Sequence, residues 1–485
     1  MISRLKILTI YFIALIISGS LIAFYSYKPV SQYFSQTNYS EPVVTWWGGS
    51  DEEGSTFITV DSSGNLYVTC FSQSFGIVGE NIFLIKYDVD GHLLWNVSWE
   101  TDDMARPYGI TIDSNEDIII TGTIVTEVDP YVFSHNVFVL KYNSTGSRIW
   151  DTIHMTSDDD DGTCIALDSN DDIYIGGGTN SSSGSMFIQK YSSDGGFQWV
   201  SYYGTTAPRE WARANGIVLD SSGDIYIAGT TDNSGGNLDD ILLVKFDSTG
   251  NALWNTTWGG PGDWDHGHDL VLSNSDIFVI GSTNSLATKP LDAILVKYNS
   301  TGHVQWNKTL DFLNEHGHAI TLKPNGNIII AGETDYLDFL YNYFVAEYNP
   351  NGVLLWNATY DSGANDYCND VVVGFNNSIF VGGRSYNETQ SNYDLAVLHF
   401  YELATITGTH TPTTTPSATT IPTNTSSPPS TSTPTNVTSP TTTTPTTGTP
   451  TSEKTGFIPG FVYYTTIIAI IGLTIILKIN NKRKK

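Results

Sequence analysis

The chain has 485 residues, with 50 acidic and 22 basic side chains and a formal net charge of −28. A surface this acidic repels the phosphates of nucleic acids and of anionic lipids, which argues against nucleic-acid binding. The three cysteines form neither a disulfide framework nor a zinc-ligand spacing.

The N-terminal segment, residues 1–28, has the features of a signal peptide or of an uncleaved signal anchor. Arg4 and Lys6 make its beginning basic, and residues 7–25 are apolar and uncharged. Either alternative directs the following residues out of the cytoplasm.

Residues 41–403 repeat one pattern. A motif Y-D/N-x-x-G-x-x-x-W, with Phe for Tyr in one copy, returns about every 52 residues. Between its copies lie segments such as TVDSSGNLYV and VLDSSGDIYI, whose Asp-x-x-Gly chemistry is typical of tight turns. A repeat of this length with strand-like segments predicts a β-propeller. The six copies of the motif are residues 87–95, 142–150, 191–199, 246–254, 298–306 and 348–356.

The repeat makes seven units of four strand-like runs each, and the seventh lacks its fourth run. Val43–Trp47 is therefore predicted to pair with Asp394–Tyr401, which closes the ring and removes an exposed strand edge. We expect an all-β fold, a seven-bladed β-propeller of four-stranded antiparallel blades closed by an N-terminal strand. A disordered stalk and terminal hydrophobic helices are expected outside this ring.

The repeats resemble the seven-bladed β-propeller (SBBP) repeat family. The resemblance rests on the DSSGNLYV and DSSGDIYIAGTT segments, on the closing Trp, and on the Asp before the third strand at Asp240, Asp292 and Asp394. It covers roughly residues 41–403 and implies the fold, but that family carries no settled biochemical activity. The x-x-G-x-x-x-W ending is also similar to quinoprotein-type repeats, some of which bind pyrroloquinoline quinone.

Three segments follow the repeats. Residues 404–456 are mostly Thr, Pro and Ser, and predict an extended, glycosylated stalk. Residues 457–479 predict a transmembrane helix, and the basic residues 480–485 a cytoplasmic tail, so we expect the cell membrane with an extracytoplasmic propeller. The order of stalk, Pro459-Gly460-Phe461, apolar span and basic tail resembles archaeal PGF-type sorting signals, which are cleaved and replaced by a lipid. A plain transmembrane anchor is the alternative.

Asn-x-Ser/Thr sequons accompany the Trp of four outer strands, where an attached glycan would meet solvent. The Trp residues themselves are predicted to be core, because equivalent positions in six units cannot all bind a ligand. The glycosylation candidates are Asn96, Asn255, Asn307 and Asn357.

The loops between strands two and three and between blades vary, whereas the other turns are short and uniform. Both variable classes share one face of a propeller, and loops on a rigid scaffold commonly carry binding residues. His266 and His268 occupy positions equivalent to His316 and His318, near the mouth of the central channel. Imidazoles two residues apart on a strand face one way, which predicts a transition-metal site. The alternative is a hydrogen-bonding histidine copied from one blade to the next.

An acidic run in the same loops is a candidate calcium site, because clustered carboxylates suit Ca²⁺. It lacks the D-x-D-x-D-G spacing with a distal Glu, so a solvated acidic loop is the alternative. Its residues are Asp158, Asp159, Asp160 and Asp161, with Asp102 and Asp103 in the preceding loop.

A third candidate consists of Arg209, Trp211 and Arg213, with Trp264 in another loop of the same face. Two arginines beside a Trp suit a carboxylate or a stacked sugar. The alternative is a local salt bridge with Glu210.

The sequence contains no G-x-S-x-G, HExxH or sialidase-type Asp box, and no adjacent Cys pair of the quinoprotein kind. We therefore predict a membrane-anchored cell-surface module that binds a protein or glycan ligand through its variable loops. The alternatives are a structural component of the cell envelope and an extracytoplasmic quinoprotein-like or hydrolytic enzyme.

Overall fold

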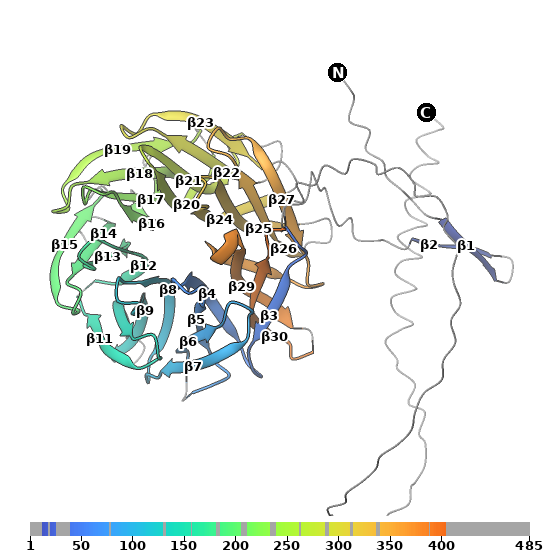
Figure 1. Ribbon diagram of the computed structural model, residues 1–485, viewed down its shortest axis with the longest axis horizontal. Coiled ribbons are helices and arrows are strands. Elements are labelled where there is room, and N and C mark those ends of the chain that lie inside the picture. The colour runs from blue at the N-terminus through green and yellow to red at the C-terminus, as the bar shows by residue number, and fades with distance from the viewer. Residues whose placement is uncertain are drawn as a thin grey trace, which may run out of the picture. The chain divides into compact units, whose positions relative to one another are not determined.

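Seven four-stranded antiparallel sheets stand around a central axis (Figure 1). The predicted all-β, seven-bladed propeller is thus confirmed. The computed structural model describes residues 12–17, 20–25 and 39–403, except residues 77–78, 130–131, 157, 181–184, 205–210, 233–238, 261–262, 287–290, 311–313, 336–339 and 388.

The blades are labelled A to G in chain order, and the strands of each are given from the innermost outward. Blade A contains β4 (Glu53–Val60), β5 (Leu66–Ser72), β6 (Asn81–Tyr87) and β7 (Leu93–Trp99). Blade B contains β8 (Met104–Ile112), β9 (Ile118–Asp129), β10 (Val132–Tyr142) and β11 (Arg148–His154). Blade C contains β12 (Asp160–Leu167), β13 (Ile173–Thr179), β14 (Met186–Tyr191) and β15 (Phe197–Tyr203). Blade D contains β16 (Trp211–Leu219), β17 (Ile225–Asp232), β18 (Asp240–Phe246) and β19 (Ala252–Trp258).

Blade E contains β20 (Asp265–Ser273), β21 (Asp276–Thr283), β22 (Asp292–Tyr298) and β23 (Val304–Thr309). Blade F contains β24 (Asn314–Leu322), β25 (Ile328–Asp335), β26 (Tyr341–Tyr348) and β27 (Leu354–Tyr360). Blade G contains β28 (Asp366–Val373), the short 3-10 helix η1 (Phe375–Asn377), β29 (Ile379–Asn387), β30 (Asn392–Phe400) and β3 (Val43–Trp47).

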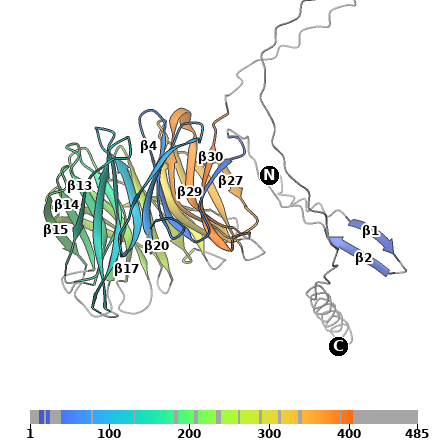
Figure 2. The ribbon, with the colours of Figure 1, turned by 90° about the horizontal axis from the view of Figure 1, so that it is seen from below.

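Each blade is an up-and-down meander, so its connections lie on the two faces of the disc (Figure 2). The turn face carries the turns between strands one and two and between strands three and four. There, for example, Asp61 Oδ1 accepts the backbone N–H groups of Ser63 at 3.0 Å and of Asn65 at 2.8 Å. The loop face carries the strand two-to-three loops and the blade-to-blade connections, which are the variable loops of the sequence.

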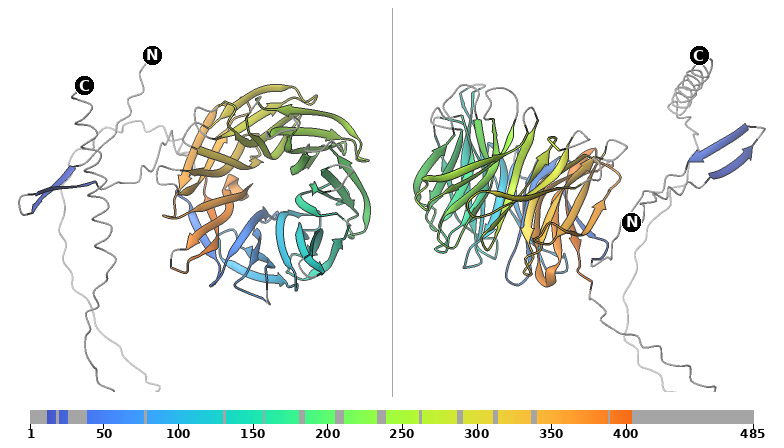
Figure 3. Two further views of the ribbon diagram at one scale, coloured as in Figure 1. Left: turned by 180° about the vertical axis from the view of Figure 1, so that it is seen from behind. Right: turned by 90° about the horizontal axis from the view of Figure 1, so that it is seen from above.

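The middle strands are apolar on both sides because a neighbouring blade covers each side of a sheet. Every residue of β5 and of β6 is buried. The outermost strands instead leave alternate residues exposed, such as Leu253, Asn255 and Thr257 in β19. Figure 3 shows the same ring from behind and from above.

The N-terminal strand β3 closes the ring in blade G, as predicted. It pairs antiparallel with β30, from Val43 opposite His399 to Trp47 opposite Leu395. The outer edge of β30 is therefore covered, and blade G has four strands like the others.

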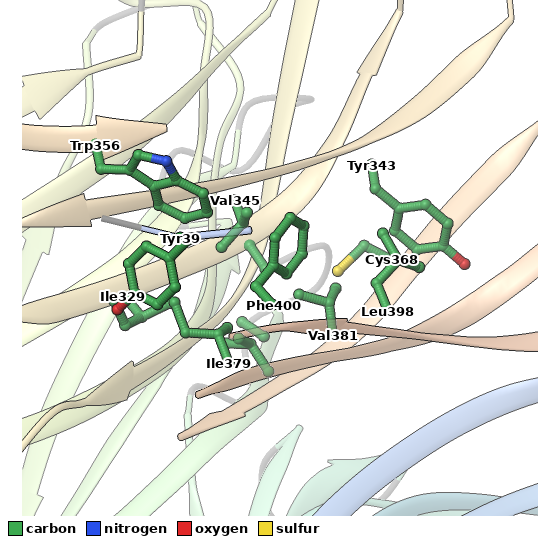
Figure 4. Packing of buried hydrophobic residues seen from close by; sticks show 13 residues of the cluster. Tyr39, Ile329, Tyr343, Val345, Trp356, Cys368, Ile379, Val381, Leu398 and Phe400 are labelled. Atoms are coloured by element: carbon green, nitrogen blue, oxygen red, sulfur yellow. The ribbon is translucent and has the colours of Figure 1, made fainter. Parts of the chain in front are cut away.

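The closing segment, residues 39–47, also covers the motif Trp of blade F. The ring centroid of Tyr39 lies 4.5 Å from that of Trp356, and both side chains are fully buried. Figure 4 shows the two rings beside Phe400 and Val345 in one buried cluster. A bridge between Tyr39 and Glu402 extends the pairing of β3 with the C-terminal end of the propeller.

The Gly and Trp of the repeated motif meet across neighbouring blades. Gly250, with φ of 84°, lies in the turn before β19, and a Cβ built on it would be 2.9 Å from the Trp199 indole of the preceding blade. The motif Trp residues pack against the core clusters, as predicted. The same contact joins Gly146 to Trp95, Gly195 to Trp150, Gly302 to Trp254 and Gly352 to Trp306.

A buried or half-buried Lys of strand three binds the turn Asp in most blades. In blade D, Lys245 Nζ lies 3.5 Å from Asp220 and 2.7 Å from Asp224, and stands 4.8 Å over the ring centroid of Tyr226. Lys86, Lys141, Lys190 and Lys297 make the corresponding ion pairs in blades A, B, C and E.

Blade F reverses the charges of this pair. Lys323 stands at the turn position of Asp220, and Glu347 stands at the strand position of Lys245, with Nζ and Oε1 3.7 Å apart. The reversal lets Lys323 also bind Glu402 at 2.9 Å. Tyr39 Oη accepts a 2.8 Å hydrogen bond from Lys323 and donates one of 3.2 Å to Glu347, so the exchanged pair lies at the closing segment.

The expected N-terminal hydrophobic helix is wrong for residues 12–25. There β1 (Phe12–Ile17) and β2 (Ser20–Tyr25) pair antiparallel, with Ile17 opposite Ser20. The many Ile and aromatic residues favour extended backbone, and only Ser18 and Gly19 separate the two strands in sequence. Within the described ranges, no helix has the length and apolar character that a membrane crossing requires. The predicted stalk, transmembrane helix and basic tail lie outside the described residues.

Candidate functional site

The innermost strand of every blade contains a β-bulge. At one place in each blade the register between strands one and two shifts and leaves an extra residue on the inner strand. Because the innermost strands surround the central channel, these bulge residues form one ring beside it. They are Thr56 (with Ser55) in blade A, then Tyr108, Thr163, Asn215, His268, His318 and Asn369.

Several bulge residues bind the backbone of the next blade. Thr163 Oγ1 donates a 2.7 Å hydrogen bond to the carbonyl of Ala214, and Asn215 Nδ2 donates one of 2.7 Å to the carbonyl of Gly267. Polar side chains at the bulges thus join neighbouring inner strands and leave their remaining polar atoms for the channel.

Two residues before each bulge residue, a second ring of positions lies nearer the loop face. These mouth positions surround the entrance of the channel, and their residues differ from blade to blade. They are Gly54, Arg106, Asp161, Arg213, His266, His316 and Tyr367.

The four predicted histidines occupy the bulge and mouth positions of blades E and F. The ring centroid of His268 lies 5.0 Å from that of His318 and 6.2 Å from that of His266. The rings of His316 and His318 are nearly parallel, with centroids 6.3 Å apart. The structure therefore brings the two His-Gly-His segments together on one side of the channel.

Two of these histidines have carboxylate partners. His266 Nε2 lies 3.0 Å from Asp239 Oδ2, and His318 Nε2 lies 3.2 Å from Glu333 Oε1. Burial opposes charge on His318, but the Glu333 carboxylate outweighs burial and raises the pKa of His318. Burial, and then the neighbouring histidines, lower the pKa of His268 well below its ordinary value. His268 is therefore neutral at pH 7.

The metal hypothesis needs ligand atoms that converge. Among the described residues, three such atoms within 4.8 Å of one another occur at Asp88, Asp90 and His92, in the turn before β7. The four predicted histidines are not brought that close in this arrangement. A transition metal at the histidines would require their rings to turn, and this site stays a prediction.

A chain of aromatic rings crosses the loop face over blades E, F and G. Neighbouring ring centroids in this aromatic belt lie 5.0 to 6.3 Å apart. The belt begins at Trp264, whose residue surface is 54% exposed. In order of contact it consists of Trp264, His266, His268, His318, His316, Tyr341, Tyr367, Tyr393 and Tyr386.

A cavity of about 250 Å³ opens beside this belt, lined by residues of blades A, B, F and G. The missing Cβ of Gly54 lets two of the lining side chains, Phe71 and Arg384, lie close to the backbone of β4. A Cβ built on Gly54 would lie 2.9 Å from the Phe71 ring and 3.2 Å from Arg384 Nη1. Its lining includes Glu52, Phe71, Arg106, His318, Tyr367 and Arg384.

Two arginines approach the cavity from the blades that flank blade A. Arg106 of blade B is held by Glu80, with Nε at 2.5 Å and Nη2 at 2.7 Å from the carboxylate oxygens. Arg384 of blade G rests on two phenol rings, with Cζ 5.1 Å from the centroid of Tyr367 and 4.7 Å from that of Tyr393. Two cationic groups therefore line the cavity, together with the carboxylates of Glu52 and Glu333.

Two half-buried carboxyl groups follow bulge residues beside the channel. Asp269 Oδ1 and Oδ2 accept the backbone N–H groups of Leu270 and Ile320, and Asp370 likewise accepts those of Val371 and Ile58. Burial raises the pKa of Asp269 to about 7, with Asp370 adding to the effect, and burial raises the pKa of Asp370 to about 7. All four oxygens bind backbone, so these groups join blade E to F and blade G to A.

The carboxylates of the acidic run bind different partners and do not converge on one point. Asp159 Oδ1 accepts the backbone N–H of His135 at 3.1 Å, Asp161 binds the His135 ring at 3.1 Å, and Asp160 is buried and accepts from Thr156. Asp158 is half-buried, Asp102 is exposed, and Asp103 accepts from Thr126 at 3.3 Å. These residues do not form a set of converging calcium ligands in this structure. Calcium binding by them stays a prediction.

The third candidate is only partly described, because Arg209 and Glu210 lie outside the described residues. Arg213 Nη2 lies 3.6 Å from Asp161 of blade C, so its ion pair joins two mouth positions. Trp211 is 38% exposed at the start of β16. Of the glycosylation candidates, Asn96 and Asn255 are exposed, and Asn307 and Asn357 are half-buried, all on outermost strands.

Sequence reasoning missed Arg106, Arg384 and the four tyrosines of the belt. Arg106 and Tyr367 could have been found by aligning the units on His266, because all three occupy the mouth position. Arg384 lies in a strand that otherwise resembles its counterparts, and only the folded ring places it beside Gly54.

Comparisons with known proteins concern the repeat and its architecture. Residues 198–237 match the family model of the beta-propeller repeat (SBBP). Over 336 residues the chain is 19% identical to an uncharacterized WD repeat-containing protein of Acanthamoeba polyphaga mimivirus. That match covers 47% of this chain but 24% of the viral protein, so the chain spans about a quarter of that relative's length.

Solved structures with a similar fold have low sequence identity. A protein of unknown function from Dyadobacter fermentans has a TM-score of 0.46 and 11% identity, over 75% of this chain and 99% of that one. A polysaccharide lyase has a TM-score of 0.44 and 10% identity, over 73% and 90%. These similarities concern the fold alone.

Proposed function

From a seven-bladed β-propeller with a beta-propeller (SBBP) repeat at residues 198–237, we propose a module that binds a glycan at the loop-face mouth of its central channel. The observation that carries this proposal is the aromatic belt beside a 250 Å³ cavity, on one face of a rigid ring.

Aromatic rings suit a glycan because a sugar ring has an apolar C–H face and a polar edge. Trp264 offers an exposed ring at one end of the belt, and Tyr341, Tyr367 and Tyr386 are half-buried at the other. Half-buried phenols keep their positions without the ligand, which reduces the entropy lost on binding. Several rings in series would stack on successive sugars.

The setting that we propose for this module is the cell surface. The proposal rests on the apolar, uncharged residues 7–25, on the apolar residues 461–479 and on the Thr/Pro/Ser-rich segment before them. A propeller raised on such a stalk would present its loop face to glycans or to glycoproteins of other cells.

A glycan array with the full-length chain tests this function. We expect saturable binding to a restricted set of glycans, and a loss of binding in Trp264→Ala and Tyr386→Ala. Phe375→Ala is the matched control, because Phe375 is 58% exposed but lies between β28 and β29, on the turn face. An array without binding, or equal loss in the control, would exclude the proposal.

A further inference from the structure

We propose that the glycan is acidic and that one sugar carboxylate binds the Arg384 guanidinium in the 250 Å³ cavity of the loop face. This inference rests on the proposed function and specifies its ligand class. Three features carry it: a guanidinium without a carboxylate partner among the described residues, the cavity that Arg384 lines, and the aromatic rings that hold the guanidinium.

Arg384 has an uncompensated charge. Of the four arginines in the described part of the chain, Arg106 pairs with Glu80, Arg148 with Asp151 and Arg213 with Asp161. For Arg384, the described residues provide no carboxylate within ion-pair distance. Such an unpaired cation at the lining of a cavity attracts an incoming anion locally, although the chain as a whole is acidic.

The guanidinium is held before any ligand arrives. Arg384 in β29 lies opposite Tyr367 in β28, and its Cζ rests 4.7 to 5.1 Å from two phenol centroids. Stacking against rings leaves the N–H edge of a guanidinium for in-plane hydrogen bonds, and that edge matches the two oxygens of a carboxylate.

The cavity of about 250 Å³ gives the carboxylate its space, and Arg384 is among its lining residues. Gly54 is buried beneath two of these lining residues, because a Cβ at this position would lie 2.9 Å from the Phe71 ring and 3.2 Å from Arg384 Nη1. The corresponding positions of the other blades carry Arg, Asp, His or Tyr. Glycine at this position therefore lets the Arg384 guanidinium lie close to the inner strand of blade A.

The charges around the cavity favour one negative group rather than several. Arg106 is neutralised by Glu80, and His318 lies beside Glu333. Glu52, which is exposed, adds a negative charge to the rim. One uncompensated guanidinium suits a single carboxylate. The negative charges around it would repel a run of phosphates.

The sugar ring that carries the carboxylate would lie along the belt. Tyr367 contacts both Arg384 and Tyr341, so the anion-binding group and the stacking surface are continuous. A hexuronic acid, with its carboxylate directly on the pyranose ring, joins these two features in one molecule.

The test compares hexuronate oligosaccharides with their methyl esters, which keep the sugar and lose the charge. With the full-length chain in calorimetry, we expect the acid to bind at least about tenfold more tightly than the ester, as for loss of a charge-assisted hydrogen bond. Arg384→Gln should abolish this preference by weakening acid binding to about the level of the ester. Arg148→Gln, on an outer strand, should change neither.

The outcomes separate the two proposals. Glycan binding with equal affinity for acid and ester, or an unchanged preference in Arg384→Gln, would refute the acidic-ligand inference and leave the binding function standing. Tighter binding of sulfated or phosphorylated sugars than of uronates would also refute it. An array without any glycan binding would remove both. Gly54→Leu, whose side chain would displace Phe71 and Arg384, should weaken acid binding while a thermal melt confirms that the ring is intact.

Discussion

On the turn face of this propeller the same contacts recur in blade after blade, whereas on the loop face one register position carries Gly, Arg, Asp, His or Tyr. The turn Asp binds its own backbone and a strand Lys, and the turn Gly packs on the preceding Trp. At the mouth positions, by contrast, ion pairs and ring contacts differ for every blade.

The carboxyl groups of the turn face and of the channel also differ, in the direction in which their pKa values are shifted. Burial works against charge on the turn-face Asp220, but hydrogen bonds from Ser222 and Asp224 and the charge of Lys245 outweigh it and lower its pKa. Burial instead raises the pKa values of the channel residues Asp269 and Asp370. The turn face thus stabilises the charged form of its carboxyl groups. Beside the channel, burial makes the charged form of Asp269 and Asp370 less stable. Such costs are commonly found where a fold is arranged for binding rather than for stability.

Removal of the closing strand β3 should have the largest effect, because it should destabilise the ring that carries both the turn face and the loop face. Deletion of residues 1–47 removes β3 and Tyr39, which exposes the edge of β30 and uncovers Trp356. We expect loss of cooperative thermal unfolding, and aggregation on size-exclusion chromatography. Deletion of residues 1–38 keeps both elements and is the control. Identical melting curves for the two deletions would show that the ring does not depend on β3.

A pair of Trp substitutions should separate the two regions. Trp356→Ala removes an indole that is 1% exposed, and we expect a loss of about 3–5 kcal/mol in the free energy of unfolding. Trp264→Ala, at a residue 54% exposed on the loop face, should change that free energy by less than about 0.5 kcal/mol. Urea titration measures both. A similar loss in the two variants would contradict the division into a stabilising face and a binding face.

The pH dependence of stability should reveal the channel carboxyls. Their pKa values are about 7 in the folded chain and 3.8 ordinarily, so between these values the folded state holds more protons than the unfolded state. Stability contributed by these groups therefore falls as pH rises from about 4 to about 7, by on the order of 1–3 kcal/mol.

Asp269→Asn should flatten this fall in thermal melts between pH 5 and pH 8. Asp247→Asn is the matched control, because hydrogen bonds from Thr249 and Asn251 lower the pKa of this exposed turn-face carboxyl. Its contribution is present above pH 4 and is lost only at lower pH, so the control should not alter the slope in that window. An equally steep fall in Asp269→Asn would show that Asp269 is not responsible.

The propeller and its closure could be predicted because they depend on repeated, local signals. Alternating strands recur in every unit, the motif Gly and Trp recur in six of the seven, and the missing fourth strand of blade G had one matching segment, Val43–Trp47. The hairpin at residues 12–25 was not predicted because an apolar, charge-free segment is read as a helix when only hydropathy is considered.

The site was predictable only in part. The His-Gly-His segments could be located on the loop face because they repeat. The cavity could not, because residues of blades A, B, F and G line it and only the folded ring brings them together. Sequence patterns within one unit do not indicate which side chains of different blades meet around the channel.

The cover that Tyr39 places on Trp356 makes this indole a spectroscopic reporter of ring closure. Its surroundings combine residues from both ends of the propeller, so its emission should shift to the red when β3 leaves β30, even while the other blades stay folded. The difference spectrum between the chain and Trp356→Phe would follow that opening step in denaturant separately from global unfolding. Coincident transitions would mean that the seven blades open as a single unit.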